Sequence, residues 1–354
     1  MQTYPAFRAC AAHVASVFLD AGRSVEKAVS LIGEAARGGA AIIAFPESFV
    51  PGFPIWAALR APIHGHDLFR ALAAQSVEVP GPEVRRLCEA ARRHCIHVSI
   101  GISEATRASV GCLWNSNLLI GPDGSILNHH RKLVPTFFEK LIWANGDAAG
   151  LKVAETDIGR VGMLICGENT NPLARFALMA QGEQVHISSY PPTWPTRDPG
   201  EAGRYDLAAA IRVRAGAHAF EAKVFNIVSA GVVDSTMEER IAPLGTEAVR
   251  ILRETPRGVS MILGPDAEPV VPVSSEDEGL LYAEIDLSQS VEPKQFHDVV
   301  GYYNRFDIFR FEVSTRRAEP MVINGPAAPV GYLYEADPAT NQTAAAHPPV
   351  RVRE

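Results

Sequence analysis

The feature of this sequence that most constrains its fold is the stretch from Val161 to Gly182, where an apolar run meets a polar turn and the start of a helix. Residues 161–165 are apolar or glycine, which is the pattern of a fully buried strand. Asn171 and Pro172 then supply a favourable N-cap and first helical residue, and Gly182 can end the helix. A buried strand followed by a helix is the repeating unit of α/β proteins, so the stretch predicts that class.

The same alternation continues along most of the chain. Predicted strands cover residues 8–18, 40–45, 96–103, 113–120, 125–131, 184–188, 223–229, 259–263 and 280–285, the last two as a hairpin-like pair. Predicted helices begin at Ser24 and cover residues 66–77, 82–94 and 205–222. Strands alternating with helices of this length indicate an α/β architecture. From Arg316 onward the sequence is rich in alanine and proline without periodicity, so we expect one large domain, residues 1–314, and a C-terminal tail, residues 315–354, that is extended or takes part in assembly.

Charge and cysteine content exclude several classes of protein. The formal net charge of −7 argues against a general nucleic-acid or anionic-membrane surface, because such surfaces are basic. The sequence has no membrane-spanning apolar segment, and its start lacks the pattern of a signal peptide. The five cysteines are odd in number and show no CxxC pair, which favours a reducing cytoplasm over a disulfide framework or a zinc site.

Cys166 directly follows the predicted strand and is the first candidate reactive residue. A thiol at such a corner faces backbone N–H groups and the positive end of the following helix, and both favour the thiolate. The alternative is a buried structural cysteine, because free cysteine is among the most buried residue types.

Glu47 and Lys132 also come just after predicted strands, and α/β folds gather their sites outside the carboxyl ends of strands. A thiolate nucleophile needs a base, and a carboxylate with a raised pKa can serve. A nearby lysine stabilises both the thiolate and the charge that develops on the substrate. The set fits acyl-type transfer through a covalent thioester. The alternatives are a solvated turn acid for Glu47 and a basic surface patch for Lys132.

Two further groups of polar residues have structural interpretations. His129 and His130 are adjacent in a predicted strand and point to opposite faces, so we predict no metal site there. Glu168 lies near the start of the predicted helix, and we expect it to pair with Arg175.

Four segments together resemble the nitrilase superfamily of carbon–nitrogen hydrolases, and within it the nitrilase branch. The segment FPESFVPGFP resembles the family's first-glutamate motif, with Glu47 at the position of the glutamate. The segment HRKLVPTFFEK resembles the family's lysine motif, in which Lys132 matches the lysine and Glu139 matches the second glutamate. CGENTNPLARFALMAQGEQVH resembles the nucleophile segment, at Cys166, and DVVGYYNRFDIFRFEV the end of the domain. The resemblance covers residues from about 7 to 313.

The resemblance implies a four-layer α-β-β-α sandwich that dimerises into a longer α-β-β-α-α-β-β-α stack. The dimers would associate into larger homo-oligomers, and the protein would need no metal and no organic cofactor. The resemblance also implies hydrolysis of a small nitrile to the acid and ammonia. Glu47 would act as base, Cys166 as nucleophile, Lys132 as the stabilising cation and Glu139 as the residue that orients the lysine or water. Phe53, Trp143, Gly167, Tyr190 and Trp194 would form the wall of the substrate pocket.

Two other functions are compatible with the same residues: an amidase of the superfamily, and a non-catalytic scaffold that retains the fold. Gly167 departs from the tryptophan common in nitrilases, which implies a more open wall beside the sulfur. Either Gly167 leaves space, which we favour, or it supplies a backbone conformation with positive φ.

Overall fold

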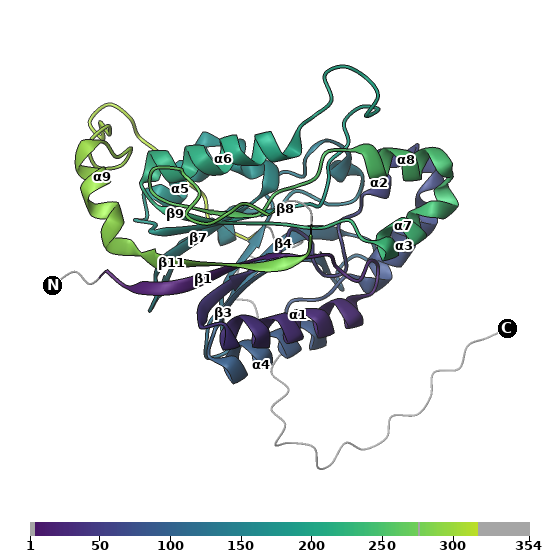
Figure 1. Cartoon of the computed structure of the whole chain (residues 1–354), viewed down its shortest axis with the longest axis horizontal. Coiled ribbons are helices and arrows are strands. Elements are labelled where there is room, and N and C mark those ends of the chain that lie inside the picture. Colours follow the sequence, from purple (N-terminus) through teal and green to yellow (C-terminus); the bar gives the residue numbers. More distant parts are fainter. Residues whose placement is uncertain (1–3, 275–276, 318–354) are drawn as a thin grey trace, which may run out of the picture. The chain divides into compact units, whose positions relative to one another are not determined.

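Two mixed β-sheets face each other in this protein, and helices cover their outer faces (Figure 1). The structure is a computed structural model that describes residues 4–274 and 277–317. The predicted tail therefore lies almost wholly outside the described residues. The layers of the described domain are α-β-β-α, as the resemblance implied.

The first sheet has the order β11-β1-β2-β3-β4-β5. Its strands are β1 (Ala6–His13), β2 (Ala40–Ala44), β3 (His97–Ala105), β4 (Leu113–Ile120), β5 (Ile126–Arg131) and β11 (Gly279–Asp286). β1, β2 and β3 run parallel, whereas β4, β5 and β11 each pair antiparallel with their neighbours. The carboxyl ends of β2 and β5 deliver the segments that carry Glu47 and Lys132.

The second sheet has the order β10-β9-β8-β7-β6. Its strands are β6 (Ala154–Thr156), β7 (Gly159–Ile165), β8 (Val185–Tyr190), β9 (Phe225–Ala230) and β10 (Met261–Leu263). β7, β8 and β9 are parallel and buried throughout their central residues. The apolar run of β7 predicts this burial, whereas β8 and β9 also bury polar residues such as His186 and Asn226. Cys166 follows β7, the strand that opens the stretch from Val161.

Alternation of side chains along β1 shows how the layers are held. Ala9 and Ala11 pack between the sheets against residues such as Ile187, whereas Cys10 and Ala12 pack outward with the helices α1 (Ala21–Arg37) and α4 (Pro82–His94). The helices α5 (Pro172–Met179) and α6 (Leu207–Ala222) cover the other sheet (Figure 1). Both faces of β1 are thus buried, one against the other sheet and one against the helices.

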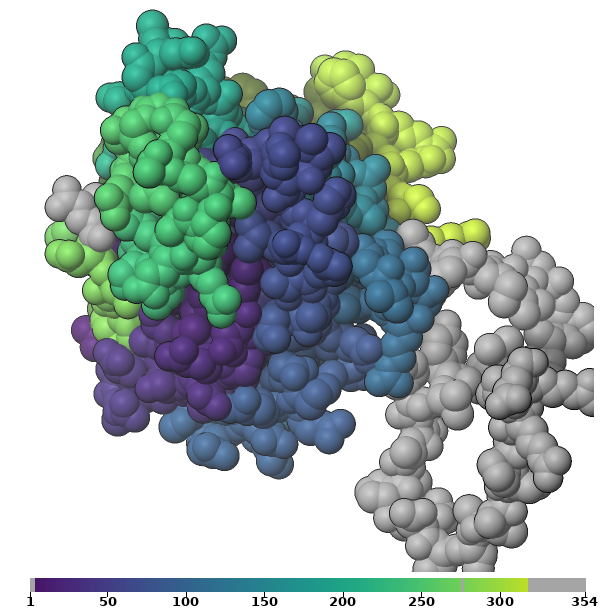
Figure 2. Space-filling view, turned by 90° about the vertical axis from the view of Figure 1, so that its right-hand side faces the viewer, coloured from purple at the N-terminus to yellow at the C-terminus, as the bar shows by residue number. Residues whose placement is uncertain are grey.

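Short helices cover the end of the sandwich at which Cys166 lies. They are α2 (Trp56–Leu59), α3 (His66–Gln75), α7 (Ser235–Ile241) and α8 (Thr246–Glu254). α2 packs against α8, and Figure 2 faces this end, with the α7–α8 segment in green beside the blue-violet α2–α3 segment. The remaining elements are α9 (Val291–Phe296) and the 3₁₀ turns η1 (Pro62–His64), η2 (Phe137–Leu141), η3 (Ala148–Gly150), η4 (Cys166–Thr170), η5 (Ala242–Leu244) and η6 (Leu287–Ser290).

Most predicted elements are confirmed within a few residues, and three differ. β1 ends at His13 rather than at residue 18, and α1 begins at Ala21 because Asp20 caps it by accepting a hydrogen bond from the Arg23 amide. β10 and β11 are not a hairpin-like pair: β10 pairs with β9 in one sheet, and β11 with β1 in the other. The helices α7 and α8 were not predicted. Among residues 4–274 and 277–317, no helix has the length and apolarity that crossing a membrane requires.

Candidate active site

Lys132 lies between two buried carboxylates. Its Nζ is 2.7 Å from Oε1 of Glu47 and 2.5 Å from Oε2 of Glu139, and all three side chains are fully buried. Burial opposes the charge of Lys132, but Glu139 and Glu47 raise its pKa well above the usual value. The lysine is therefore a permanent cation in a dry site, and not part of a surface patch.

Glu47 has one engaged oxygen and one without a partner. Oε1 accepts hydrogen bonds from Lys132 Nζ and from Asn115 Nδ2, each at 2.7 Å. Oε2 is buried and has no hydrogen-bond partner among the described residues. Burial raises the pKa of Glu47 to about 7, although Lys132 opposes the shift. A free oxygen and a pKa near neutrality are the properties that a general base requires.

Glu139 is positioned by the turn in which it lies. Its Oε2 accepts from the Thr136 amide at 3.0 Å as well as from Lys132, which closes a capping box at the start of η2. Its Oε1 is buried without a partner among the described residues. Glu139 is therefore not a helix-surface acid, and its position fixes that of the lysine.

Cys166 completes the group. A carboxylate oxygen of Glu47, a carboxylate oxygen of Glu139 and Sγ of Cys166 all lie within 4.8 Å of one another. The cysteine is 3% exposed, and its backbone has a φ of +50°, a left-handed conformation that is costly for a side-chain-bearing residue. The strand-to-turn transition thus projects the thiol into the site.

The prediction of a stabilised thiolate is wrong for the resting protein. Burial raises the pKa of Cys166 well above its usual value, Glu47 adds to the shift, and Lys132 opposes it. Backbone N–H groups and a helix end can be read from local sequence, whereas complete burial is a property of the tertiary structure. The resting site therefore holds a thiol next to a base.

Glu168 holds the turn of Cys166 in place. Its carboxylate accepts hydrogen bonds from the Ile165 amide at 2.9 Å and the Leu133 amide at 2.6 Å, and it lies 2.9 Å from Nε2 of His130. These contacts tie the segment that follows β7 to the segment of Lys132.

The predicted Glu168–Arg175 pair is wrong, because Arg175 faces α6 and pairs with Glu221 at 2.8 Å. The opposite orientation of the two adjacent histidines is confirmed. His129 Nε2 lies 2.7 Å from Glu104, on the other face of β5 from His130.

A second buried polar network supports η4, the turn that begins at Cys166. Asn169 donates to the carbonyl oxygen of Cys166 at 3.1 Å, and its own Oδ1 lies 2.9 Å from Nε2 of His186. Glu183 bridges Nδ1 of His186 at 2.7 Å and Nε2 of His218 at 2.6 Å. Burial lowers the pKa of His218 to about 4, and the two histidines lower that of Glu183 to about 2. Sequence reasoning missed this network, because its members come from the turn η4, the start of β8 and the helix α6, which meet only in the tertiary structure.

Comparison with known proteins agrees with this geometry. A family model described as carbon-nitrogen hydrolase matches residues 8–295. The chain belongs to the carbon–nitrogen hydrolase family. A nitrilase of Paraburkholderia phymatum is 36% identical over 318 residues, which cover 89% of this chain and 88% of that protein. A cyanide hydratase of Botryotinia fuckeliana is 36% identical over 316 residues, 88% of this chain and 84% of that one. The crystal structure of a carbon–nitrogen hydrolase from Helicobacter pylori G27 has the same fold, with a TM-score of 0.68 at 19% identity over 86% of this chain and 97% of that one.

Gly167 of this carbon–nitrogen hydrolase follows neither of its two predicted roles. Its φ is not positive, since the left-handed residue is its neighbour Cys166. Nor does it border open space, because a Cβ at this position would lie 2.7 Å from Oγ1 of Thr136. Gly167 instead allows the nucleophile turn to approach the turn that holds Glu139.

The aromatic residues predicted to form the pocket wall are brought together. Phe53, Trp143, Tyr190 and Trp194 all belong to the apolar cluster that contains Cys166. The rings of Phe53 and Trp143 are 5.7 Å apart. Phe138 was not predicted, but it stacks on Trp194 at 5.3 Å and lies 6.2 Å from Phe53. Its place next to Glu139 in the sequence is the signal that could have identified it.

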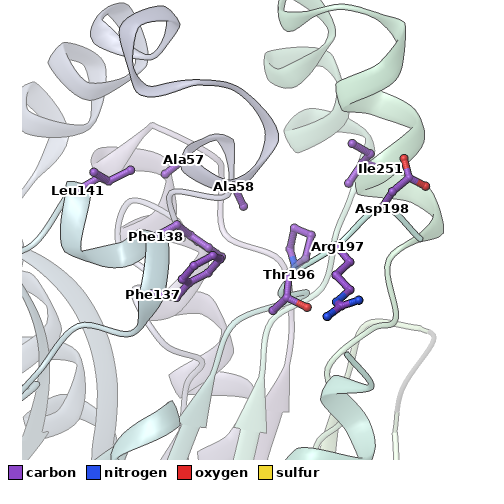
Figure 3. A pocket seen from close by; sticks show the side chains of 10 residues that line it. Ala57, Ala58, Phe137, Phe138, Leu141, Thr196, Arg197, Asp198 and Ile251 are labelled. Carbon is purple, nitrogen blue, oxygen red and sulfur yellow. The ribbon is translucent and has the colours of Figure 1, made fainter. Parts of the chain in front are cut away.

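The site is closed in this structure. The cavity that reaches Glu47 has a volume of only about 10 Å³. A hollow of about 510 Å³ lies nearby, with Phe137, Phe138 and Leu141 on one side and Ile251 and Arg197 on the other (Figure 3). Phe138 belongs both to the lining of this hollow and to the cluster around Cys166. The catalytic group and the larger hollow are thus separated by aromatic side chains.

Proposed function

We propose that this hydrolase converts an organic nitrile and two molecules of water to a carboxylic acid and ammonia, with Cys166 as the nucleophile. The observation that carries the proposal is the position of Lys132 between two buried carboxylates beside the thiol. The similarity to proteins named nitrilase supports the choice of a nitrile as substrate.

In the first step, the unpaired oxygen of Glu47 accepts the proton of the Cys166 thiol as the sulfur bonds to the nitrile carbon. One carbon–nitrogen π bond breaks, and the nitrogen takes up the proton that Glu47 received from the thiol, which gives a thioimidate and restores the carboxylate. The charge that develops on nitrogen is stabilised by the ammonium of Lys132, which already has a fixed position and needs no reorganisation.

In the second step, water adds to the thioimidate carbon, and both of its protons pass in turn to nitrogen, so that the carbon–nitrogen bond breaks, ammonia leaves and a thioester remains. A second water then releases the acid and restores the thiol. The unpaired Oε1 of Glu139 faces no other partner among the described residues and is suited to orient one of these waters.

Access to the thiol requires side-chain movement, because the space beside Glu47 is too small for a substrate. We propose that the substrate approaches from the hollow in Figure 3 and that Phe138 and Trp194 separate to admit it. The apolar lining of this route suits a nitrile whose substituent is partly apolar.

The test of the function is ammonia and acid release from a panel of nitriles by the native protein and by Cys166→Ala and Cys166→Ser. We expect both variants to fold, because the change removes little core volume, and to lose turnover. The matched control is Cys112→Ala, at a cysteine that lies outside the site. Turnover by either Cys166 variant at a rate comparable with the native protein would overturn the assignment.

Two other products or substrates are distinguished by the same assay. The similarity to a cyanide hydratase makes release of the amide a second candidate outcome, in which the thioimidate loses sulfur rather than ammonia. The ratio of amide to acid measures this partition. An amidase would instead release ammonia faster from an amide than from the matched nitrile, and a non-catalytic scaffold would act on neither.

A further inference from the structure

Arg214 is a cation beside the nucleophile turn that the proposed chemistry does not use. It lies on α6, and its Nε donates a hydrogen bond of 2.7 Å to Oγ1 of Thr170, the last residue of the turn η4 that begins at Cys166. Its guanidinium carbon is 5.9 Å from the centre of the Tyr205 ring, over which the charge lies. These contacts fix the guanidinium at the edge of the site.

No carboxylate lies within ion-pairing distance of Arg214 among the residues that the structure describes. Burial opposes the charge of its guanidinium, and no described carboxylate offsets that cost. The charge of Lys132, by contrast, is already shared by Glu47 and Glu139. Arg214 is therefore the cation near the thiol that is left for a ligand.

Two buried hydrogen-bond donors near Arg214 also have no partner in the described structure. The hydroxyl of Tyr190, a fully buried residue, and Nε1 of Trp194 are both unpaired. Trp194 contacts Tyr205, with ring centres 5.3 Å apart, and both Tyr190 and Trp194 belong to the cluster of Cys166. Buried donors without an acceptor are unfavourable, and a hydrocarbon substituent would leave them so.

We propose that the preferred substrate is a nitrile that carries a carboxylate, and that Arg214 binds this carboxylate while Tyr190 or Trp194 donates to it. The planar guanidinium, already oriented through Nε, presents its terminal N–H groups in the geometry that carboxylates accept. The product is then a dicarboxylate. This inference rests on the proposed nitrile hydrolysis and specifies its substrate class.

The test compares ω-cyano carboxylates with two, three and four methylenes against alkyl nitriles of equal chain length. We expect the native protein to favour the best cyano acid over its alkyl match by about 10- to 100-fold in kcat/KM, the range of a hydrogen-bonded charge pair. In Arg214→Gln this ratio should collapse toward one, and in Arg214→Lys it should fall less. Arg212→Gln, at an exposed arginine of the same helix, is the control and should leave the ratio unchanged.

A second measurement uses only the native protein, in case Arg214→Gln does not fold. Pentanoate should inhibit hydrolysis of an alkyl nitrile competitively, and 1-pentanol, which has the same chain length and no carboxylate, should inhibit much more weakly. A native protein without preference for any cyano acid, a ratio unchanged in Arg214→Gln, or equal inhibition by pentanoate and 1-pentanol would overturn the inference. Ammonia release from alkyl nitriles alone would refute this inference and leave the proposed function intact, whereas no release from either series would refute the function.

Discussion

Replacing Lys132 by methionine tests the electrostatic design of the site most directly. The substitution keeps an unbranched apolar chain of similar length and removes the ammonium from between Glu47 and Glu139, which are 2% and 0% exposed. Breaking a buried ion pair by removing one partner costs about 3–5 kcal/mol, because the remaining charge is left without a partner. We therefore expect a loss of about 3–5 kcal/mol in the free energy of unfolding at pH 7.

The pH dependence of this loss follows from the pKa of the acids. In the native protein, the pKa of Glu47 is raised from 4.5 to about 7, so the folded state binds more protons than the unfolded state between these values and stability falls as pH rises through them. Without Lys132, which lowers the pKa of Glu47, the native-state pKa of Glu47 should rise further. The fall in stability then continues above pH 7, by about 1.4 kcal/mol per pH unit while Glu47 is still protonated in the folded state.

The assay is urea denaturation at pH 6.0 and 8.5, with Lys140→Met as a control at an exposed lysine of η2, the turn that contains Glu139. The loss in Lys132→Met should be larger at pH 8.5, and the double variant Lys132→Met/Glu139→Gln should recover part of it. A loss below about 1 kcal/mol that does not change with pH would refute the reasoning, because it would mean that the carboxylates are solvated or already neutral.

Three further outcomes are expected. The acidic limb of kcat/KM should have an apparent pKa near 7, since Glu47 must be ionised to accept the thiol proton; a limb near 4.5 would contradict its role as base. Gly167→Ala should lower the rate about tenfold on nitriles of every size, because its Cβ would displace Thr136, whose amide holds Glu139. The second substitution Thr136→Ala should restore part of the rate. A loss confined to bulky substrates would contradict this explanation. The face of α6 that exposes Val213 and Phe220 should be covered by a second copy, so Val213→Glu should reduce the particle mass in light scattering; a native protein that is already monomeric would contradict this.

Local patterns were sufficient to predict the main features of the site. The apolar run before Cys166 predicts β7, and a similar run precedes Glu47. Lys132 follows a mostly polar strand, residues 125–131. Because α/β folds collect such residues at strand ends, the sequence alone predicted that these three would meet. The tertiary contacts confirm that they do, with Lys132 between the acids.

The errors concern properties that arise only from packing. The pKa of Cys166 depends on its complete burial, which no local motif encodes. The partner of Glu168 is His130 rather than Arg175, because the sheets face each other and bring β5 to the turn after β7. Arg214 has no signal in the sequence, since its importance depends on which turn α6 packs against.

The burial of Cys166 determines how readily its thiol is oxidised and how it can be chemically labelled. A thiol that is 3% exposed and protonated is a poor target for peroxide, so the resting enzyme should resist conversion of its nucleophile to sulfenic acid. The exposed Cys95 should be modified first. For Cys166, the rate of alkylation by reagents of increasing width reports how often, and how far, the aromatic side chains separate. Alkylation of Cys166 is thereby a measure of the side-chain movement that we propose for substrate entry.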